Sequence, residues 1–128
     1  MELDLDLAAL ARSIRLWGRE LGFQKVGIAG VELPDDEARL REWLAQRRHG
    51  TMQYMQRHSV RRARPAELVS GTVRVISARM DYSTAAARAE DVLGNPELAY
   101  VSRYALGRDY HRIVRPRLAR LADRIAAT

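Results

Sequence analysis

The stretch LAALARSIRLWGREL, residues 7–21, places large apolar side chains three and four residues apart. These side chains are Leu7, Leu10, Ile14, Trp17 and Leu21. Such steps bring them onto one face of an α-helix, so the stretch predicts an amphipathic helix that packs against the rest of the fold. Asp4 or Asp6 would cap the start of this helix, and Gly22 would close its end.

The remainder of the chain predicts short strands among further helices. Strands are predicted at residues 26–29, 72–82 and 98–104, of which the second is the richest in β-branched residues. Helices are predicted at residues 34–48, 65–69 and 109–125, and residues 83–97 are predicted to form a helix or a loop. The order of elements predicts an α/β chain of the α+β type, with a small mixed sheet flanked by helices, in a single domain spanning residues 1–128.

Length and composition are those of one globular domain. The chain has 128 residues, a net charge of +6, 47% hydrophobic and 30% charged residues, and no cysteine. The absence of cysteine excludes a disulfide framework and any thiolate-bound zinc or iron–sulfur cluster within these residues. There is no apolar run long enough to cross a membrane, and the acidic start, MELDLDLAAL, is unlike a secretory signal. We therefore expect a cytoplasmic protein without a membrane partner.

Positive charge is concentrated in the second part of the chain and is almost entirely arginine. Residues 1–46 carry a net charge of −3, residues 47–128 a net charge of +9, and Lys25 is the single lysine. Arginine binds phosphate and carboxylate groups in a planar, bidentate manner and stacks on bases, so RNA or a phosphorylated ligand is one expected partner. An ordinary mixed-charge surface is the alternative.

The stretch SRYALGRDYH, residues 102–111, has the composition of a ligand-pocket wall. Gly107 would allow close backbone approach, and Arg103 and Arg108 would hold anionic groups. Asp109 lies at the N-terminus of a predicted helix, where free backbone amides favour a charged carboxylate, so its simplest role is that of a helix cap. A catalytic proton donor would need the opposite environment, one that raises its pKa. The three histidines have no metal-ligand spacing, so no protein-built metal site is predicted.

Three sequence blocks together resemble the N-terminal part of the tRNA epoxyqueuosine reductase (QueG) family. They are HGTMQYM at residues 49–55, RRARPAELVSGTVRVISARMDY at residues 61–82 and YVSRYALGRDYH at residues 100–111. Their order and spacing agree with the family, and the third block is the most specific. The likeness covers nearly the whole chain but only the front third or so of a full-length member, so we expect the chain to be the N-terminal part of a longer enzyme.

The resemblance implies a cobalamin-dependent reduction of epoxyqueuosine to queuosine at the wobble position of the tRNA anticodon. Members hold base-off cobalamin and two [4Fe–4S] clusters, whose cysteine ligands lie outside these residues, and a full-length member is expected to be monomeric. The family's proton donor, the aspartate of its G-[RK]-D-Y-H motif, carries over to Asp109. Residues expected to line the cobalamin pocket are Tyr82, Arg103, Tyr104, Tyr110 and His111.

Two other interpretations remain beside this one. The excess of arginine is also typical of a small basic RNA-binding domain without catalysis, and a degenerate remnant that only folds is the third possibility. We expect the isolated chain to be inactive, because residues 1–128 contain no cysteine to hold the clusters that would deliver electrons.

Overall fold

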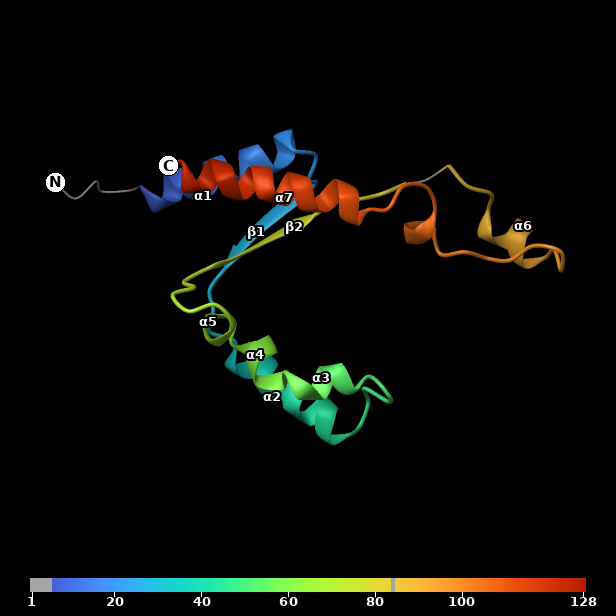
Figure 1. Ribbon diagram of the computed structural model, residues 1–128, viewed down its shortest axis with the longest axis horizontal. Helices are drawn as coiled ribbons and strands as arrows, with labels where there is room; N and C mark the ends of the chain where they lie inside the picture. Colours follow the sequence, from blue (N-terminus) through green and yellow to red (C-terminus); the bar gives the residue numbers. More distant parts are fainter. Residues whose placement is uncertain (1–5, 84) are drawn as a thin grey trace. The chain divides into compact units, whose positions relative to one another are not determined.

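Figure 1 presents a computed structural model of the chain, which describes residues 6–83 and 85–128. The chain divides into two compact units: the first joins the chain up to Val26 with Ala78–Thr128, and the second is Gly27–Ser77. Strands β1 (Lys25–Ala29) and β2 (Val75–Arg79) pair in a two-stranded antiparallel sheet. A small sheet accompanied by helices confirms the predicted α+β class.

Helix α1 (Leu7–Glu20) confirms the helix predicted from the first apolar stripe. Asp6 caps it, because its Oδ1 accepts hydrogen bonds from the backbone N–H groups of Ala8 and Ala9, both at 2.9 Å. Asp4, the other candidate cap, lies outside the described residues. Burial follows the predicted face only partly, since Ile14 is buried whereas Leu7 at the helix start is 69% exposed.

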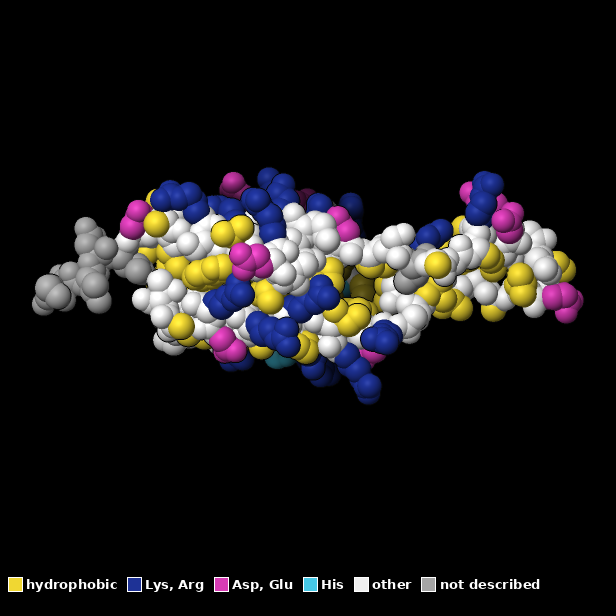
Figure 2. Space-filling model, turned by 90° about the horizontal axis from the view of Figure 1, so that it is seen from above, with side chains coloured by type: hydrophobic (Ala, Val, Ile, Leu, Met, Phe, Trp, Pro, Cys, Tyr) yellow, Lys and Arg dark blue, Asp and Glu magenta, His cyan; other side chains and the backbone are white. Residues whose placement is uncertain are grey.

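The first unit is built around the packing of α1 against α7 (His111–Ala126), which run side by side in Figure 1. Its buried hydrophobic side chains are Ile14, Phe23, Val26 and Leu121. Gly18 allows the close approach of β1, because a Cβ atom at this position would lie 2.3 Å from Val26 Cγ2. Arg124 Nη1 and Glu20 Oε2, 2.6 Å apart, connect the two helices at the surface. Seen from above α1 and α7, basic and acidic side chains lie beside one another (Figure 2).

The second unit contains helices α2 (Pro34–Ala45), α3 (Gln53–Arg57), α4 (Ser59–Ala63) and α5 (Pro65–Leu68), with α4 packed against α2 and α5. Helix α2 begins at Pro34 as predicted but ends three residues before residue 48, the predicted end. The reason is a turn at Arg47, whose φ of 54° lies in the left-handed region and is incompatible with continued helix.

The strand predicted at residues 98–104 is wrong. This segment is irregular apart from a 3₁₀ turn at Arg103–Ala105, and Leu98, Tyr100 and Val101 are 53%, 49% and 47% exposed. A strand needs a neighbour to bond its backbone, and β1 and β2 pair with each other rather than with this segment. Within the preceding segment, residues 83–97, the helix α6 (Ala89–Leu93) forms, as one of the two predicted alternatives.

Replacement of Leu121 by alanine tests the importance of the α1–α7 packing. Leu121 is 3% exposed, and deletion of its buried methyl groups should lower the free energy of unfolding by about 2–5 kcal/mol. Leu118 on the same helix is 41% exposed, so Leu118→Ala is the matched control and should cost much less. Urea denaturation followed by circular dichroism measures both changes, and equal decreases would contradict this account of the core.

Candidate functional site

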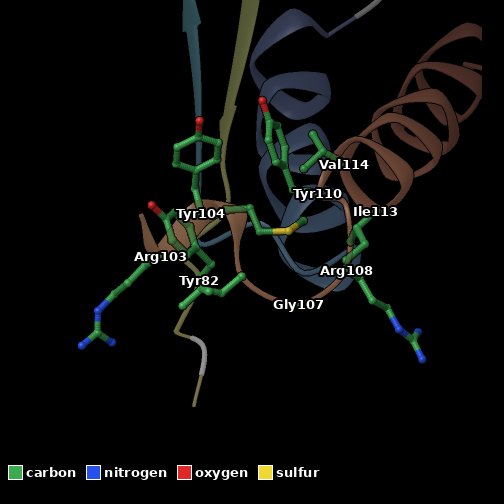
Figure 3. Close-up of a pocket in the computed structure, with 10 residues that line it drawn as sticks. Tyr82, Arg103, Tyr104, Gly107, Arg108, Tyr110, Ile113 and Val114 are labelled. Atoms are coloured by element: carbon green, nitrogen blue, oxygen red, sulfur yellow. The ribbon is translucent and has the colours of Figure 1, made fainter. Parts of the chain in front are cut away.

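A cavity of about 470 Å³ lies in the first unit, close to the start of α7 (Figure 3). It is lined by Met80, Tyr82, Arg103, Tyr104, Leu106, Gly107, Arg108, Tyr110, Ile113 and Val114. Its volume is within the usual range for small-molecule pockets. Most of these side chains are aromatic or aliphatic, and the charged groups are two arginines. The cavity therefore suits a ligand with large apolar faces and polar or anionic groups at its edges.

Three segments of the chain converge on the cavity. Met80 and Tyr82 follow the end of β2, Arg103 and Tyr104 belong to the 3₁₀ turn, and Ile113 and Val114 lie in the first turns of α7. Gly107 connects the last two segments with a φ of 82°, a conformation that favours glycine. In Figure 3 the side chains of Arg103 and Arg108 extend in opposite directions, away from the centre of the cavity.

Aromatic contacts fix the tyrosines at the cavity wall. The rings of Tyr104 and Tyr110 meet edge to face, with centroids 6.2 Å apart and an interplanar angle of 77°. On its other side Tyr110 stacks on the His111 imidazole, with centroids 4.0 Å apart and an angle of 28°. Both arrangements are favourable for aromatic pairs. The contacts connect the cavity wall directly to the first residue of α7.

Asp109 and His111 form a hydrogen-bonded pair at the start of α7. Asp109 Oδ1 lies 2.8 Å from His111 Nδ1 and accepts a hydrogen bond from the His111 backbone N–H at 3.0 Å. The Arg112 N–H also donates to the Asp109 backbone carbonyl, at 3.1 Å. The side chain of Asp109 thus satisfies a free amide at the helix start, although the cap position itself is occupied by Tyr110.

This environment favours the ionised form of Asp109. Hydrogen bonds from His111, first from its imidazole and then from its backbone N–H, hold the pKa of the Asp109 carboxyl below its usual value. The charges of His111 and Arg115 act in the same direction. A lowered pKa means that Asp109 carries a negative charge at neutral pH. In this state of the chain Asp109 is a hydrogen-bond acceptor and does not hold a transferable proton.

The structure divides the six predicted site residues into two groups. Tyr82, Arg103, Tyr104 and Tyr110 line the cavity. Asp109 and His111 do not line it but lie next to it, since Asp109 borders a second hollow of about 510 Å³ that shares Arg108 and Ile113 with the first.

Sequence reasoning did not find four of the cavity residues: Met80, Leu106, Ile113 and Val114. Leu106 lies inside the 102–111 block, so the motif itself could have indicated it. Ile113 and Val114 lie on the helix that follows the motif, within about one turn of Tyr110. Met80 carries no local signal, because only the fold brings the end of β2 to the cavity.

Within the part of the chain that the structure describes, no three histidine, aspartate or glutamate residues lie close enough together to hold a metal ion. No helix in the same residues has the length and apolar character needed to cross a bilayer. The chain has no cysteine at any position.

Comparison with known proteins shows a consistent set of similarities. Residues 62–128 match the family described as "Epoxyqueuosine reductase QueG, DUF1730". The chain is 61% identical to an epoxyqueuosine reductase of Pseudomonas aeruginosa over 122 residues, which are 95% of the chain and 34% of that protein. It is 55% identical to the Yersinia pestis protein of the same name over 121 residues, covering 94% and 29% of the two chains.

A third relative gives the same result. The epoxyqueuosine reductase of Escherichia coli K12 is 53% identical over 125 residues, covering 98% of the chain and 33% of the relative. The chain therefore spans about a third of the length of the curated relatives it matches. No solved structure matches it.

The effect of His111 on Asp109 can be measured by titration. His111→Ala removes the hydrogen bond that contributes most to the lowered pKa of Asp109, while the backbone N–H bond remains. We expect the titration midpoint of the Asp109 carboxyl to move to higher pH in this variant. Carbon-13 NMR of the side-chain carboxyl measures it, and His58→Ala is a control in the other unit. A midpoint that stays in place or moves to lower pH would disprove this cause.

Proposed function

This chain belongs to the epoxyqueuosine reductase QueG family, DUF1730, and from this premise we propose that it supplies the cofactor-facing cavity and the proton donor for reduction of epoxyqueuosine in tRNA. The observation that carries the proposal is the position of the GRDYH block, residues 107–111, which forms part of the cavity wall and the start of α7. A single turn of chain thus joins a ligand pocket to an acidic side chain.

The cavity residues fit one face of a cobalamin molecule. Tyr82, Tyr104 and Tyr110, with the aliphatic side chains beside them, offer apolar surface for a flat ring system. Arg103 and Arg108 offer donors for the polar groups at the edge of such a ring. Cobalamin is much larger than this cavity, so these residues would form one wall of its site. Bound cobalamin would supply a reduced metal centre as the electron source at the epoxide carbon.

Iron–sulfur clusters do not fit these residues. Clusters of the [4Fe–4S] type are held by cysteine thiolates, and none of the 128 residues is a cysteine. The chemistry proposed for this chain is therefore limited to ligand binding and proton transfer.

Opening an epoxide leaves an oxygen that must accept a proton, and we assign its delivery to Asp109. In the present state the carboxylate is ionised, so a proton must reach it first. A large apolar ligand beside α7 would displace water from the Asp109–His111 pair, and loss of water disfavours charged forms. With His111 as imidazolium, its Nδ1 proton would then move across the 2.8 Å hydrogen bond to Asp109 Oδ1, leaving a neutral imidazole, and Asp109 would pass that proton to the epoxide oxygen. His111 in this scheme reloads the acid and positions it.

Cobalamin binding by the 128-residue chain tests the cavity. Tyr104→Ala removes a ring from the wall together with its edge-to-face contact to Tyr110, and should weaken binding of base-off cobalamin about tenfold. Titration followed by visible absorbance measures the dissociation constant. Tyr100→Ala is the matched control, because Tyr100 is exposed and does not line this cavity. Equal affinities of the two variants, or no binding by the parent chain, would refute the assignment.

Proton donation is tested in a chimera in which this chain replaces the matching third of the Pseudomonas aeruginosa relative. Asp109→Asn keeps an oxygen that accepts from the His111 N–H but cannot donate a carboxyl proton. The single-turnover rate of epoxyqueuosine reduction should fall by about 10²–10⁴-fold, with little change in melting temperature. Asp123→Asn, on the same helix near its other end, is the control. A rate close to that of the unmodified chimera would leave Asp109 with only a structural role, as acceptor for the His111 N–H at the helix start.

A further inference from the structure

We propose that residues 47–62, here called the basic segment, form a surface that binds RNA by contacting phosphates and stacking on an unpaired base. The segment belongs to the second unit, whereas the cavity and Asp109 belong to the first. The proposal therefore uses none of the residues assigned to reduction, and its test is independent of theirs.

The basic segment carries positive charge that no nearby carboxylate neutralises. Its arginines are Arg47, Arg48, Arg57, Arg61 and Arg62, all of them exposed. The sequence contains no acidic residue between Glu42 and Glu67. Among the described residues, none of these five arginines forms an ion pair. The face seen from above α1 and α7 differs, because basic and acidic side chains are both present there (Figure 2). Unpaired arginines attract an anionic partner.

Arg64 follows the segment in sequence but has a different task. Its guanidinium binds both carboxylate oxygens of Glu37, at 2.9 and 3.0 Å, and reaches Glu67 at 2.8 Å. These contacts hold the pKa of the Glu37 carboxyl below its usual value, with the hydrogen bond from Arg64 as the largest cause. Arg64 thereby attaches the boundary of α4 and α5 to α2. With Arg64 engaged and Ala63 buried, Arg61 and Arg62 are left at the surface of α4.

An exposed aromatic ring lies within this charge cluster. The guanidinium carbon of Arg62 is 5.6 Å from the centroid of the Tyr54 ring, and Arg62 Nη2 donates to the Tyr54 backbone carbonyl at 3.2 Å. The Tyr54 hydroxyl contacts Met52 Sδ at 3.4 Å, and Tyr54 is 56% exposed. A fixed ring beside a guanidinium plane is the arrangement on which unpaired nucleic-acid bases stack.

The turn that contains Arg47 and Arg48 is fixed by contacts with Trp43 of α2. His49 is 5% exposed, and its ring lies 5.9 Å from that of Trp43. The Arg48 N–H donates to the Trp43 carbonyl at 3.2 Å, and the Gly50 N–H donates to the Arg47 carbonyl at 3.1 Å. Since the backbone is fixed in this way, binding of a partner by these arginines costs less conformational entropy.

The chemistry of the segment favours RNA over other anionic partners. Anionic membranes are bound by amphipathic helices with a broad apolar face, and α3 and α4 have only five residues each. An acidic protein surface would use the charges but would have no special need for the exposed ring. RNA uses both, because phosphates bind arginine and unpaired bases stack on tyrosine.

Binding of the 128-residue chain to a short labelled RNA hairpin with a single-stranded loop tests the proposal. Fluorescence anisotropy measures the affinity at salt concentrations between about 50 and 200 mM. The triple variant Arg57→Ala, Arg61→Ala, Arg62→Ala should flatten the log–log salt slope by about 2, because each phosphate that is no longer bound lowers the slope by about 0.7. Tyr54→Leu should weaken binding about tenfold without this change in slope, and Tyr54→Phe should bind like the parent chain.

A matched control separates this surface from general positive charge. The triple variant Arg74→Ala, Arg88→Ala, Arg120→Ala removes the same charge outside the segment and should keep the parent slope. The proposal is overturned if both triple variants weaken binding equally, if the parent chain does not bind the hairpin, or if the segment binds phosphatidylserine vesicles in preference to RNA. Circular dichroism confirms that each variant is folded, and none of these outcomes depends on cobalamin binding or on reduction.

Discussion

The contact between the first and the last helix of the chain determines where everything else in its unit can lie. Helices α1 and α7 pack against each other, Ile14 on α1 and Leu121 on α7 are buried, and Gly18 lets β1 approach α1 so closely that any larger residue would collide with Val26. This approach places Gln24 beside the end of β2, where its side chain accepts a hydrogen bond from the Asp81 N–H at 2.7 Å. Arg117 of α7 in turn reaches Met80 Sδ at 3.8 Å. Helix packing thus contributes to the cavity, because α7 carries the wall residues Ile113 and Val114 and its Arg117 contacts the wall residue Met80.

Arginine serves two different purposes in the chain, and the position of carboxylates separates them. Arg64 and Arg124 each form an ion pair with a glutamate that is distant in sequence, and these pairs connect one helix to another. Arginines without such partners keep their charge for external contacts. Exposed ion pairs contribute little to stability, so these arginines lose little stabilisation by having no carboxylate partner, and their unpaired charge leaves a surface suited to anionic ligands.

Local patterns in the sequence predicted where helices and strands form better than they predicted which segments pack or pair with one another. Apolar residues spaced three and four apart predicted α1 and α7, and a proline followed by acidic residues predicted the start of α2. These signals could be read because each acts within a few residues of sequence. The apolar content of residues 98–104 suggested a strand, but hydrogen bonding to a neighbour decides strand formation, and sequence content does not reveal the neighbour. Likewise, the motif around Gly107 indicated tyrosine and arginine residues of the cavity, whereas the inclusion of Met80 depends on tertiary packing.

The pairing of Asp109 with His111 connects the structural role of Asp109 at the helix start with the proton-donor role proposed for it. Had the helix begun at Asp109, as the sequence suggested, residues two apart would point to different faces and the pair would not form. Because α7 begins at His111, Asp109 can turn back and accept from both the backbone and the imidazole of that residue. The bonds that stabilise the helix start also keep the carboxylate ionised. Protonation of Asp109 would therefore require that these hydrogen bonds be weakened, and under the proposed function this couples proton transfer to the exclusion of water from the site.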